Sequence, residues 1–213
     1  MARIVKEAEA RKDEILDAAE ALFMEKGFEG ASTDDILRRV GIARGTLYYH
    51  FKSKEDIMDA LIDRYTAAMT AAARAAAAEQ GVPADARVLR AVLALKSPGG
   101  PDRAISEHIH KPRNALMHRK IQKEILARVT PIIAGIVEDG IAQGVFRTPF
   151  PYESVEMIVA YANTVFDDDM VELSDEARFV RAVALIHNAE RMFGVSEGGL
   201  SHLLPMFGGD RAE

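Results

Sequence analysis

Cations and aromatic residues gather in one short stretch near the start of the chain. Residues 36–54 include no Asp or Glu, although the whole chain has a net charge of −6. A phosphate backbone attracts a local group of cations without counter-charges, whatever the charge of the remaining protein. For Arg38 and Arg39 we prefer a solvent-exposed role to a phosphate contact. The stretch predicts a nucleic-acid contact made by some of its cations: Arg38, Arg39, Arg44, Lys52 and Lys54.

Within this stretch, residues 44–51 have the pattern of a short helix with one apolar side. Leu47 and Phe51 are four residues apart and would face inward, so the other residues would point outward. The major groove of DNA is about 12 Å wide and accepts a helix that carries polar or aromatic groups. A core position for Tyr48, with its hydroxyl at the surface, is an alternative. The residues that would face the groove are Arg44, Gly45, Thr46, Tyr48, Tyr49 and His50.

A second polar segment, residues 107–118, could bind a metal ion. If the chain is helical across Pro112, one face of that helix carries Glu107, His110, Asn114 and His118. Imidazoles with an acidic side chain opposite, such as Asp167 or Asp168, would suit zinc or nickel. We prefer solvated or singly hydrogen-bonded histidines, because Pro112 can end one helix and begin another. The sequence thus predicts no cofactor and no bound metal, with three residues kept as candidate ligands: His110, His118 and Asp168.

Two short helices with a tight turn between them would position the cationic stretch. Ser32 or Thr33 provides an N-cap for the first of these helices, and Gly41 ends it. Residues 41–43 then form the turn before the second helix. Two short helices joined by a turn that contains glycine are the parts of a helix-turn-helix, whose second helix enters the major groove.

Apolar residues recur at helical spacing along the rest of the chain, and no segment has the sustained alternation of a β-strand. The sequence therefore predicts an all-α fold. The expected helices are 5–26, 33–40, 44–51, a long helix from about 54 into the Ala-rich segment 67–78, 84–96, 102–110, 112–143, 151–167, 175–193 and 198–206.

The helix-turn-helix region contains an extended motif. It reads Thr33-x-x-Ile36, then Gly41-Ile42-x-x-Gly45-Thr46-Leu47-Tyr48-Tyr49-His50-Phe51-Lys52-Ser53-Lys54-Glu55. This motif resembles that of the TetR family of bacterial transcriptional repressors, and the resemblance covers about residues 10–62. It departs from the common pattern at Leu37 and Val40, where small residues are more usual. The resemblance implies a helix-turn-helix DNA-binding domain in residues 1–53 and an effector-binding and dimerisation domain in residues 54–213.

The resemblance also implies roles for individual residues. Base edges would be approached by the first residues of the second short helix: Arg44, Gly45 and Thr46. The DNA backbone and thymine methyl groups would be contacted by Tyr48, Tyr49 and His50. Phosphates would be contacted at the N-termini of two helices by Thr33 and Lys54. An arginine at position 44 favours guanine but does not specify an operator.

Further implications concern the rest of the chain. The protein would be a homodimer that binds a pseudo-palindromic operator in double-stranded DNA and is released by a small-molecule effector. Residues 151–167 and 175–193 agree with a dimer, since their apolar faces are broader than a small monomer usually buries. For most of the apolar pocket candidates we prefer a place in the ordinary core. The candidate effector contacts are Met69, Leu93, Ile109, His110, Asn114, Met117, His118 and Phe166.

The composition indicates the cellular compartment in which the protein would function. The absence of Cys excludes disulfide scaffolds, Cys-ligated zinc and Cys nucleophiles, and it is typical of the reducing cytoplasm. Residues 1–14 are too charged for a secretory signal, and no apolar run approaches the roughly 20 residues that span a bilayer. We therefore expect a cytoplasmic protein without membrane contact.

Two other functions remain to be weighed against a ligand-controlled repressor. A constitutive DNA-binding or chromosome-organising protein without an effector would have the same helix-turn-helix. A metal-dependent enzyme, for instance a hydrolase built on His110 and His118, would need a recognisable catalytic motif. The sequence has no HExxH, no nucleophile elbow and no glycine-rich phosphate loop after a strand. We predict that the protein is a ligand-responsive regulator and not an enzyme.

Overall fold

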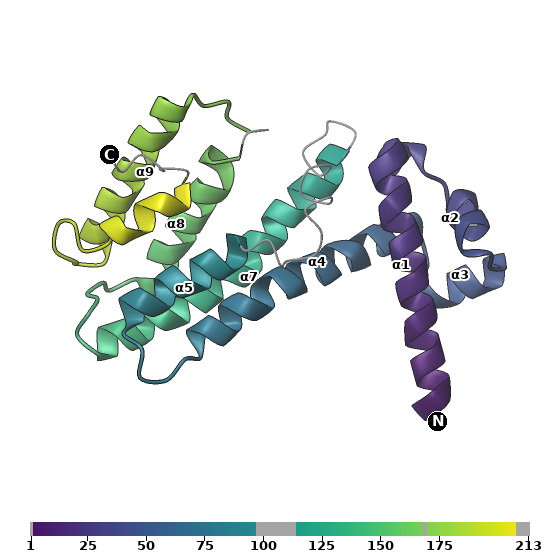
Figure 1. Cartoon of the computed structure of the whole chain (residues 1–213), viewed down its shortest axis with the longest axis horizontal. Helices are drawn as coiled ribbons and strands as arrows, with labels where there is room; N and C mark the ends of the chain where they lie inside the picture. The colour runs from purple at the N-terminus through teal and green to yellow at the C-terminus, as the bar shows by residue number, and fades with distance from the viewer. Residues whose placement is uncertain (1, 97–113, 168–169, 208–213) are drawn as a thin grey trace. The chain divides into compact units, whose positions relative to one another are not determined.

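The computed structural model describes residues 2–96, 114–167 and 170–207. Within these ranges every regular element is a helix, so the predicted all-α fold is confirmed (Figure 1). None of the described helices is both long and apolar enough to cross a membrane. The elements are α1 (Ala2–Gly30), α2 (Thr33–Val40), α3 (Arg44–His50), α4 (Lys54–Ala77), α5 (Ala84–Lys96), α7 (Ala115–Ala142), α8 (Pro151–Val165), α9 (Asp175–Met192) and the 3₁₀ helix η2 (Ser201–Phe207).

The described residues form two compact units. The first contains residues 2–66 and 114–121, and the second contains 67–96, 122–167 and 170–207. Both α4 and α7 contribute one segment to each unit. The units therefore divide within α4, after Thr66, whereas the functional boundary predicted from the sequence lies between residues 53 and 54. That functional boundary stays a prediction, because compactness does not measure function.

Local sequence signals explain the ends of the first helices. Gly27 interrupts α1 with φ of 76°, a left-handed value that favours glycine and matches the helix end expected there. Ser32 caps α2: its Oγ accepts from the amide of Asp35 at 3.1 Å, and its own amide donates to the Asp35 carboxylate at 3.1 Å. Gly41, with φ of 74°, ends α2. Helix α2 has the bounds that the sequence predicted.

Helices α1 and α4 frame the first unit. The side chains of α1 that the helical spacing placed inward, such as Ile15 and Phe23, are buried, as are Ile57 and Leu61 of α4. Arg64 of α4 adds two ion pairs to α1, one to Asp17 at 2.7 Å and one to Glu20 at 2.6 Å.

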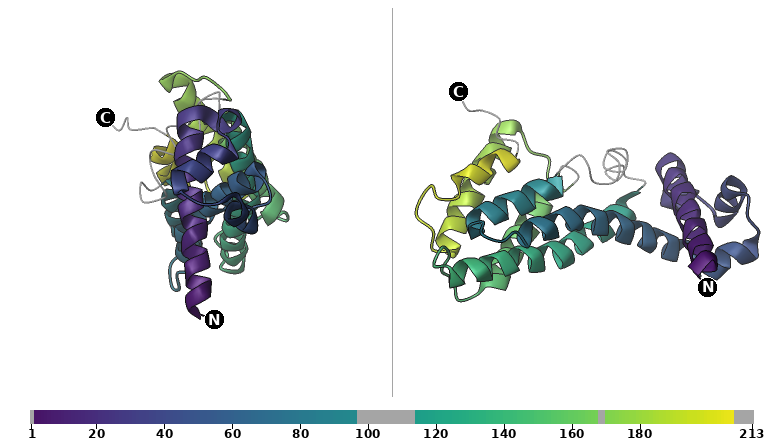
Figure 2. Two further views of the ribbon diagram at one scale, coloured as in Figure 1. Left: turned by 90° about the vertical axis from the view of Figure 1, so that its right-hand side faces the viewer. Right: turned by 60° about the horizontal axis from the view of Figure 1, so that its bottom comes forward.

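Helices α5, α8 and α9, together with one segment each of α4 and α7, surround the core of the second unit (Figures 1 and 2). In the Ala-rich segment, Ala73 and Ala76 are buried, and their small side chains let helices pack closely. Arg87 of α5 donates to the carbonyl of Ala77 at 2.9 Å and to the carboxylate of Asp139 at 2.8 Å. This buried guanidinium caps the C-terminal end of α4 and joins it to α5 and α7.

Candidate DNA interface and ligand cavity

Helix α3 is anchored by two apolar residues. Leu47 and Phe51 are almost fully buried, as their spacing predicted. The turn before α3 depends on Gly41, whose amide donates to the carbonyl of Leu37 at 2.9 Å. Because the anchors lie on one side only, the opposite side of α3 is free to contact another molecule.

The outward side of α3 carries bare backbone and large aromatic rings. Gly45 is exposed, and a Cβ added there would meet nothing within 4 Å. Tyr48 is 46% exposed and Tyr49 is 79% exposed, so neither ring is enclosed by the core. His50 packs edge-on against Tyr49, with ring centroids 5.0 Å apart. Thr46 and Thr33, the first residue of α2, are partly exposed. Exposed tyrosines on a short helix contribute little to folding, but they suit a contact surface.

Several cations of residues 36–54 form ion pairs with acids that lie outside that stretch of sequence. Arg39 makes two 3.0 Å hydrogen bonds to the carboxylate of Glu25 in α1. These bonds lower the pKa of Glu25 and raise the pKa of Arg39. Arg38 bonds to Asp35, the capping carboxylate of α2. Arg44 forms an ion pair with a third acid, Asp34 of α2. Neighbouring acids thus hold Arg38, Arg39 and Arg44.

Lys52 and Lys54 lie in different surroundings. The side chain of Lys52 is exposed and makes no hydrogen bond or ion pair within the described part of the chain. The ammonium of Lys54 donates to the carbonyls of Phe28 at 2.7 Å and Ala31 at 3.0 Å, and it lies 4.2 Å from the ring centroid of Phe28. Lys54 therefore satisfies carbonyls at the C-terminal end of α1. This contact explains why a cation occupies the N-terminus of α4, where the helix dipole disfavours it.

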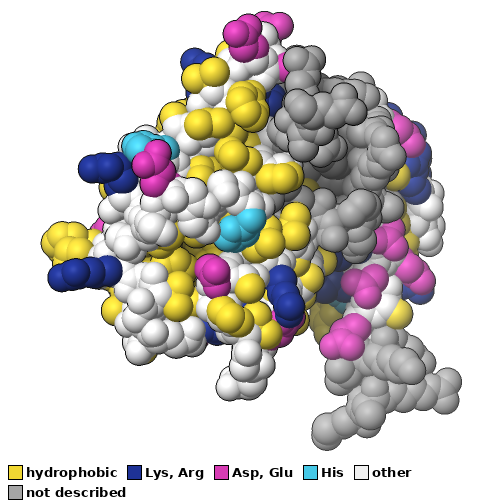
Figure 3. All heavy atoms as spheres, turned by 60° about the vertical axis from the view of Figure 1, so that its left-hand side comes forward, with side chains coloured by type: hydrophobic (Ala, Val, Ile, Leu, Met, Phe, Trp, Pro, Cys, Tyr) yellow, Lys and Arg dark blue, Asp and Glu magenta, His cyan; other side chains and the backbone are white. Residues whose placement is uncertain are grey.

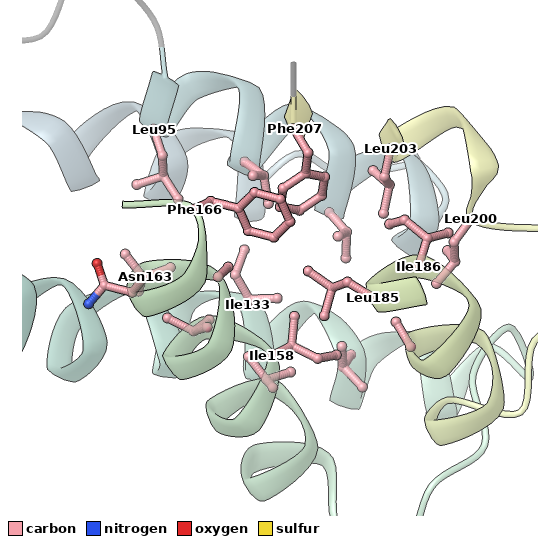
Figure 4. Close-up of a pocket in the computed structure, with 18 of the residues that line it drawn as sticks. Leu95, Ile133, Ile158, Asn163, Phe166, Leu185, Ile186, Leu200, Leu203 and Phe207 are labelled. Atoms are coloured by element: carbon pink, nitrogen blue, oxygen red, sulfur yellow. The ribbon is translucent and has the colours of Figure 1, made fainter. Parts of the chain in front are cut away.

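The second unit contains a partly open cavity of about 360 Å³ (Figure 4). The described residues of its walls come mainly from α4, α5, α7, α8, α9 and η2, and all but one of them have apolar side chains. Phe166 and Phe207 pack against each other with ring centroids 4.7 Å apart. Asn163, the polar exception, lies at one end. A cavity of this size and composition is suited to a small organic ligand.

The predicted effector contacts are dispersed in the structure. Met69 and Phe166 line the cavity. Leu93 is exposed on α5 and does not line it. Three others are buried in the first unit and do not line it: Asn114, Met117 and His118. Two predicted contacts lie outside the described residues: Ile109 and His110. Of the metal candidates, His118 is buried while His110 and Asp168 lie outside the described residues, and no three potential ligands converge in the part that is described.

Two family models match the chain. Residues 15–61 match the model of bacterial regulatory proteins of the tetR family, and residues 100–186 match that of the tetracyclin repressor-like C-terminal domain. The chain belongs to the TetR family. The first match contains the α2–α3 pair and its exposed tyrosines, which confirms the resemblance found in the motif.

A relative of known name matches a short part of this TetR-family chain. Over 48 residues this chain is 50% identical to IcaR of Staphylococcus aureus, a negative transcriptional regulator of a biofilm operon; the match covers 22% of this chain and 26% of IcaR. The chain thus matches about a quarter of that relative's length.

Solved structures of TetR-like regulators have the same fold. FadR of Bacillus subtilis, in complex with stearoyl-CoA, is 22% identical over 70% of this chain and 85% of its own, with a TM-score of 0.50. RolR, in complex with its ligand resorcinol, is 17% identical over 98% of both chains, with a TM-score of 0.54. At such identities these likenesses show the fold alone.

An exposed apolar surface on α8 and α9 is a further feature of this TetR-family chain. Met157 of α8 and Phe179, Val180 and Val183 of α9 are all exposed in the single chain. Apolar side chains are visible among polar ones on the side of the molecule that Figure 3 presents. Large exposed apolar patches mark interaction surfaces. Helical spacing predicted the broad apolar faces of these helices. It could not predict which of their apolar residues are buried within the single chain and which stay exposed.

Proposed function

We propose that this chain is a transcriptional repressor that binds a pseudo-palindromic operator as a homodimer and is released by a small-molecule effector. The observation that carries the proposal is the outward side of α3. It combines an open backbone at Gly45 with two exposed tyrosines, while the buried side chains of Leu47 and Phe51 hold the opposite side of the helix in place. A rigid helix with an open, polar and aromatic face is what major-groove recognition requires.

We assign the DNA contacts by position on this surface. Base edges would be contacted by Arg44, Gly45 and Thr46, and the DNA backbone and thymine methyls by Tyr48, Tyr49 and His50. Thr33 would contact a phosphate from the start of α2. Two of the three N–H groups of the Lys54 ammonium serve the carbonyls of α1, which leaves one for a phosphate.

The homodimer is proposed from the apolar surface on α8 and α9. Residues such as Met157 and Val180 are more than half exposed in the single chain, and a second copy would remove them from water. A two-fold symmetric pair would present two α3 helices to two half-sites. The proposal therefore predicts a DNA site with two related halves.

The effector is proposed from the cavity in the second unit. A constitutive DNA-binding protein would need no such space, so the cavity favours the ligand-controlled alternative. A ligand shifts the DNA equilibrium only by the difference in its affinity for two shapes of the protein, and a 100-fold release requires about 2.7 kcal/mol of coupling. We propose no metal-dependent enzyme, because the family is one of regulators.

Selection of bound duplexes from a random-sequence pool tests the DNA-binding role. We expect an enriched duplex with two related half-sites, and Arg44→Ala should weaken binding to it by about 1 to 3 kcal/mol while relaxing one base position. Leu93→Ala, at an exposed position of α5, is the control. Failure to enrich any duplex would contradict the proposal, and equal loss on enriched and random DNA would remove Arg44 from base reading.

A further inference from the structure

The residues that line the cavity disfavour the binding of a charged ligand. Among the described residues that line it, none is Lys, Arg, His, Asp or Glu, and only Asn163 has a polar side chain. Moving an ion from water into apolar surroundings is strongly unfavourable unless an opposite charge or several hydrogen bonds compensate. The described part of the walls offers neither an opposite charge nor several hydrogen bonds, so a charged ligand would bind here at a large disadvantage.

The orientation of the Asn163 amide is fixed by its neighbour in α7. Its Nδ2 donates to the backbone carbonyl of Gln122 at 2.9 Å. A carbonyl only accepts, so the amide group that faces it must be the nitrogen, and the amide is not free to rotate by 180°. Gln122 in turn donates from Nε2 to the Asp167 carboxylate at 2.6 Å, which holds its side chain beside α8.

This arrangement leaves Oδ1 of Asn163 as the polar atom that a ligand can use. Within the described part of the chain, no donor is bonded to it. An amide oxygen accepts hydrogen bonds and donates none. A ligand group that matches it must therefore carry a donor hydrogen, as a hydroxyl or a neutral N–H does.

We infer that the cavity binds an uncharged, largely apolar molecule that carries a single hydroxyl or N–H group, which donates to Oδ1 of Asn163. The apolar remainder of the molecule packs against residues such as Ile133, Leu185 and Phe207. The inference names the chemical class of the effector and rests on the proposed function for its regulatory meaning. Binding itself is measured without DNA, so the two proposals fail separately.

Two dyes that differ by one charged group test the exclusion of charge. N-phenyl-1-naphthylamine is neutral and has one N–H, whereas 8-anilino-1-naphthalenesulfonate has the same rings and an added sulfonate. Both are followed by their own fluorescence, and the chain has no Trp to interfere. We expect the neutral dye to bind at least tenfold more tightly. Val159→Phe, which fills part of the cavity, should weaken the neutral dye if the variant keeps its helical circular dichroism.

A matched pair of ligands tests the donor. In displacement of the neutral dye, 1-decanol should bind about fivefold more tightly than 1-methoxydecane, which lacks the donor; this is the effect of one net hydrogen bond of about 1 kcal/mol. Asn163→Leu should abolish that preference while the ether still binds. Gln143→Leu, which removes an amide from an exposed position, is the control and should keep it.

Each outcome decides one claim. Equal or tighter binding of the sulfonated dye overturns the uncharged class. Equal binding of alcohol and ether to the wild type, or an alcohol preference that survives Asn163→Leu, overturns the role of Asn163. If decanol binds as expected but does not release the protein from its selected duplex, the ligand class stands and the effector role in the proposed function fails.

Discussion

The carboxylate of Asp34 lies 2.7 Å from the guanidinium of Arg44. Asp34 belongs to the first turn of α2 and Arg44 begins α3, so the pair joins the two helices of the helix-turn-helix. Both side chains are largely exposed, and an exposed ion pair contributes little to stability. Its effect is on position: the carboxylate holds the guanidinium at the start of α3 and competes with phosphate for it.

Asp34→Asn is therefore expected to change selectivity. Without the carboxylate, Arg44 is free to contact phosphates, and one repulsive charge leaves the DNA-binding surface. Affinity for random DNA should rise, the salt dependence of that binding should steepen by about one unit, and the preference for the selected duplex should fall. Fluorescence-anisotropy titrations at several salt concentrations measure all three quantities.

The control for this change is Glu153→Gln, which removes one exposed carboxylate from α8 and alters net charge equally. It should leave the preference for the selected duplex unchanged. If Asp34→Asn and Glu153→Gln behave alike, Asp34 acts only through net charge and does not position Arg44.

Lys54 is expected to stabilise the first unit, whatever its role toward DNA. Lys54→Ala removes two hydrogen bonds from a charged donor and leaves the carbonyls of Phe28 and Ala31 without it. We expect the free energy of unfolding to fall by about 1 to 3 kcal/mol, measured by urea denaturation. Lys52→Ala is the matched control, since Lys52 is exposed, and it should leave stability nearly unchanged. Equal stability of the two variants would contradict the capping role.

The sequence predicted α2 within its observed bounds because both ends are encoded locally. Ser32 and Asp35 form a capping box over three residues, and Gly41 supplies the left-handed end. The inward positions of Leu47 and Phe51 follow from helical spacing alone. Such features depend on neighbours within one or two turns, so no knowledge of the fold is needed to find them.

Contacts between distant residues could not be predicted in the same way. The 36–54 stretch is free of acids in sequence, yet α1 brings Glu25 to Arg39. Likewise, nothing near Lys54 in the sequence indicates that its ammonium would meet the carbonyls of Phe28 and Ala31. These pairs depend on how the helices pack, which the periodicity of a single helix does not specify.

Most of the cavity lining, beyond Met69 and Phe166, could not be predicted from the sequence for a related reason. Lining residues such as Ile133 and Leu185 have the same apolar character and helical spacing as core residues such as Ile136 and Ala182. Periodicity identifies the buried face of a helix but not where packing leaves a space. Among the described lining residues, only Asn163 is of a type that could have drawn attention, because it is a polar residue that follows an apolar stretch of α8.

The apolar surface on α8 and α9 leads to a test of the dimer. Val183 is 40% exposed in the single chain, so Val183→Glu should not unfold it. In the proposed dimer the same carboxylate would be buried without a partner, and it should separate the subunits. Val145 is similarly exposed, at 37%, and lies between α7 and α8, so Val145→Glu should leave the dimer intact.

Analytical ultracentrifugation at micromolar concentration distinguishes these variants, with circular dichroism as the measure of folding. A wild-type protein that sediments as a monomer would refute the dimer. A Val183→Glu variant that remains dimeric would show that the interface lies on another surface of the chain.

Two glycines of α7 provide a test of packing beside the cavity. A Cβ added at Gly140 would overlap the ring of Phe146 and lie 2.9 Å from the Cβ of Ala84, whereas a Cβ added at Gly135 would meet nothing within 4 Å. Alanine is the better helix former by about 1 kcal/mol, so Gly135→Ala should stabilise the protein by up to that amount. Overpacking typically costs about 1 to 3 kcal/mol, so Gly140→Ala should be destabilising despite the same gain. Urea denaturation of both variants measures the difference.

Phe146 also lines the cavity, and a ring displaced by the new methyl group would enter it, so Gly140→Ala should also weaken binding of the neutral dye. Equal stability of the two variants would show that the ring of Phe146 can move away from Gly140 without cost.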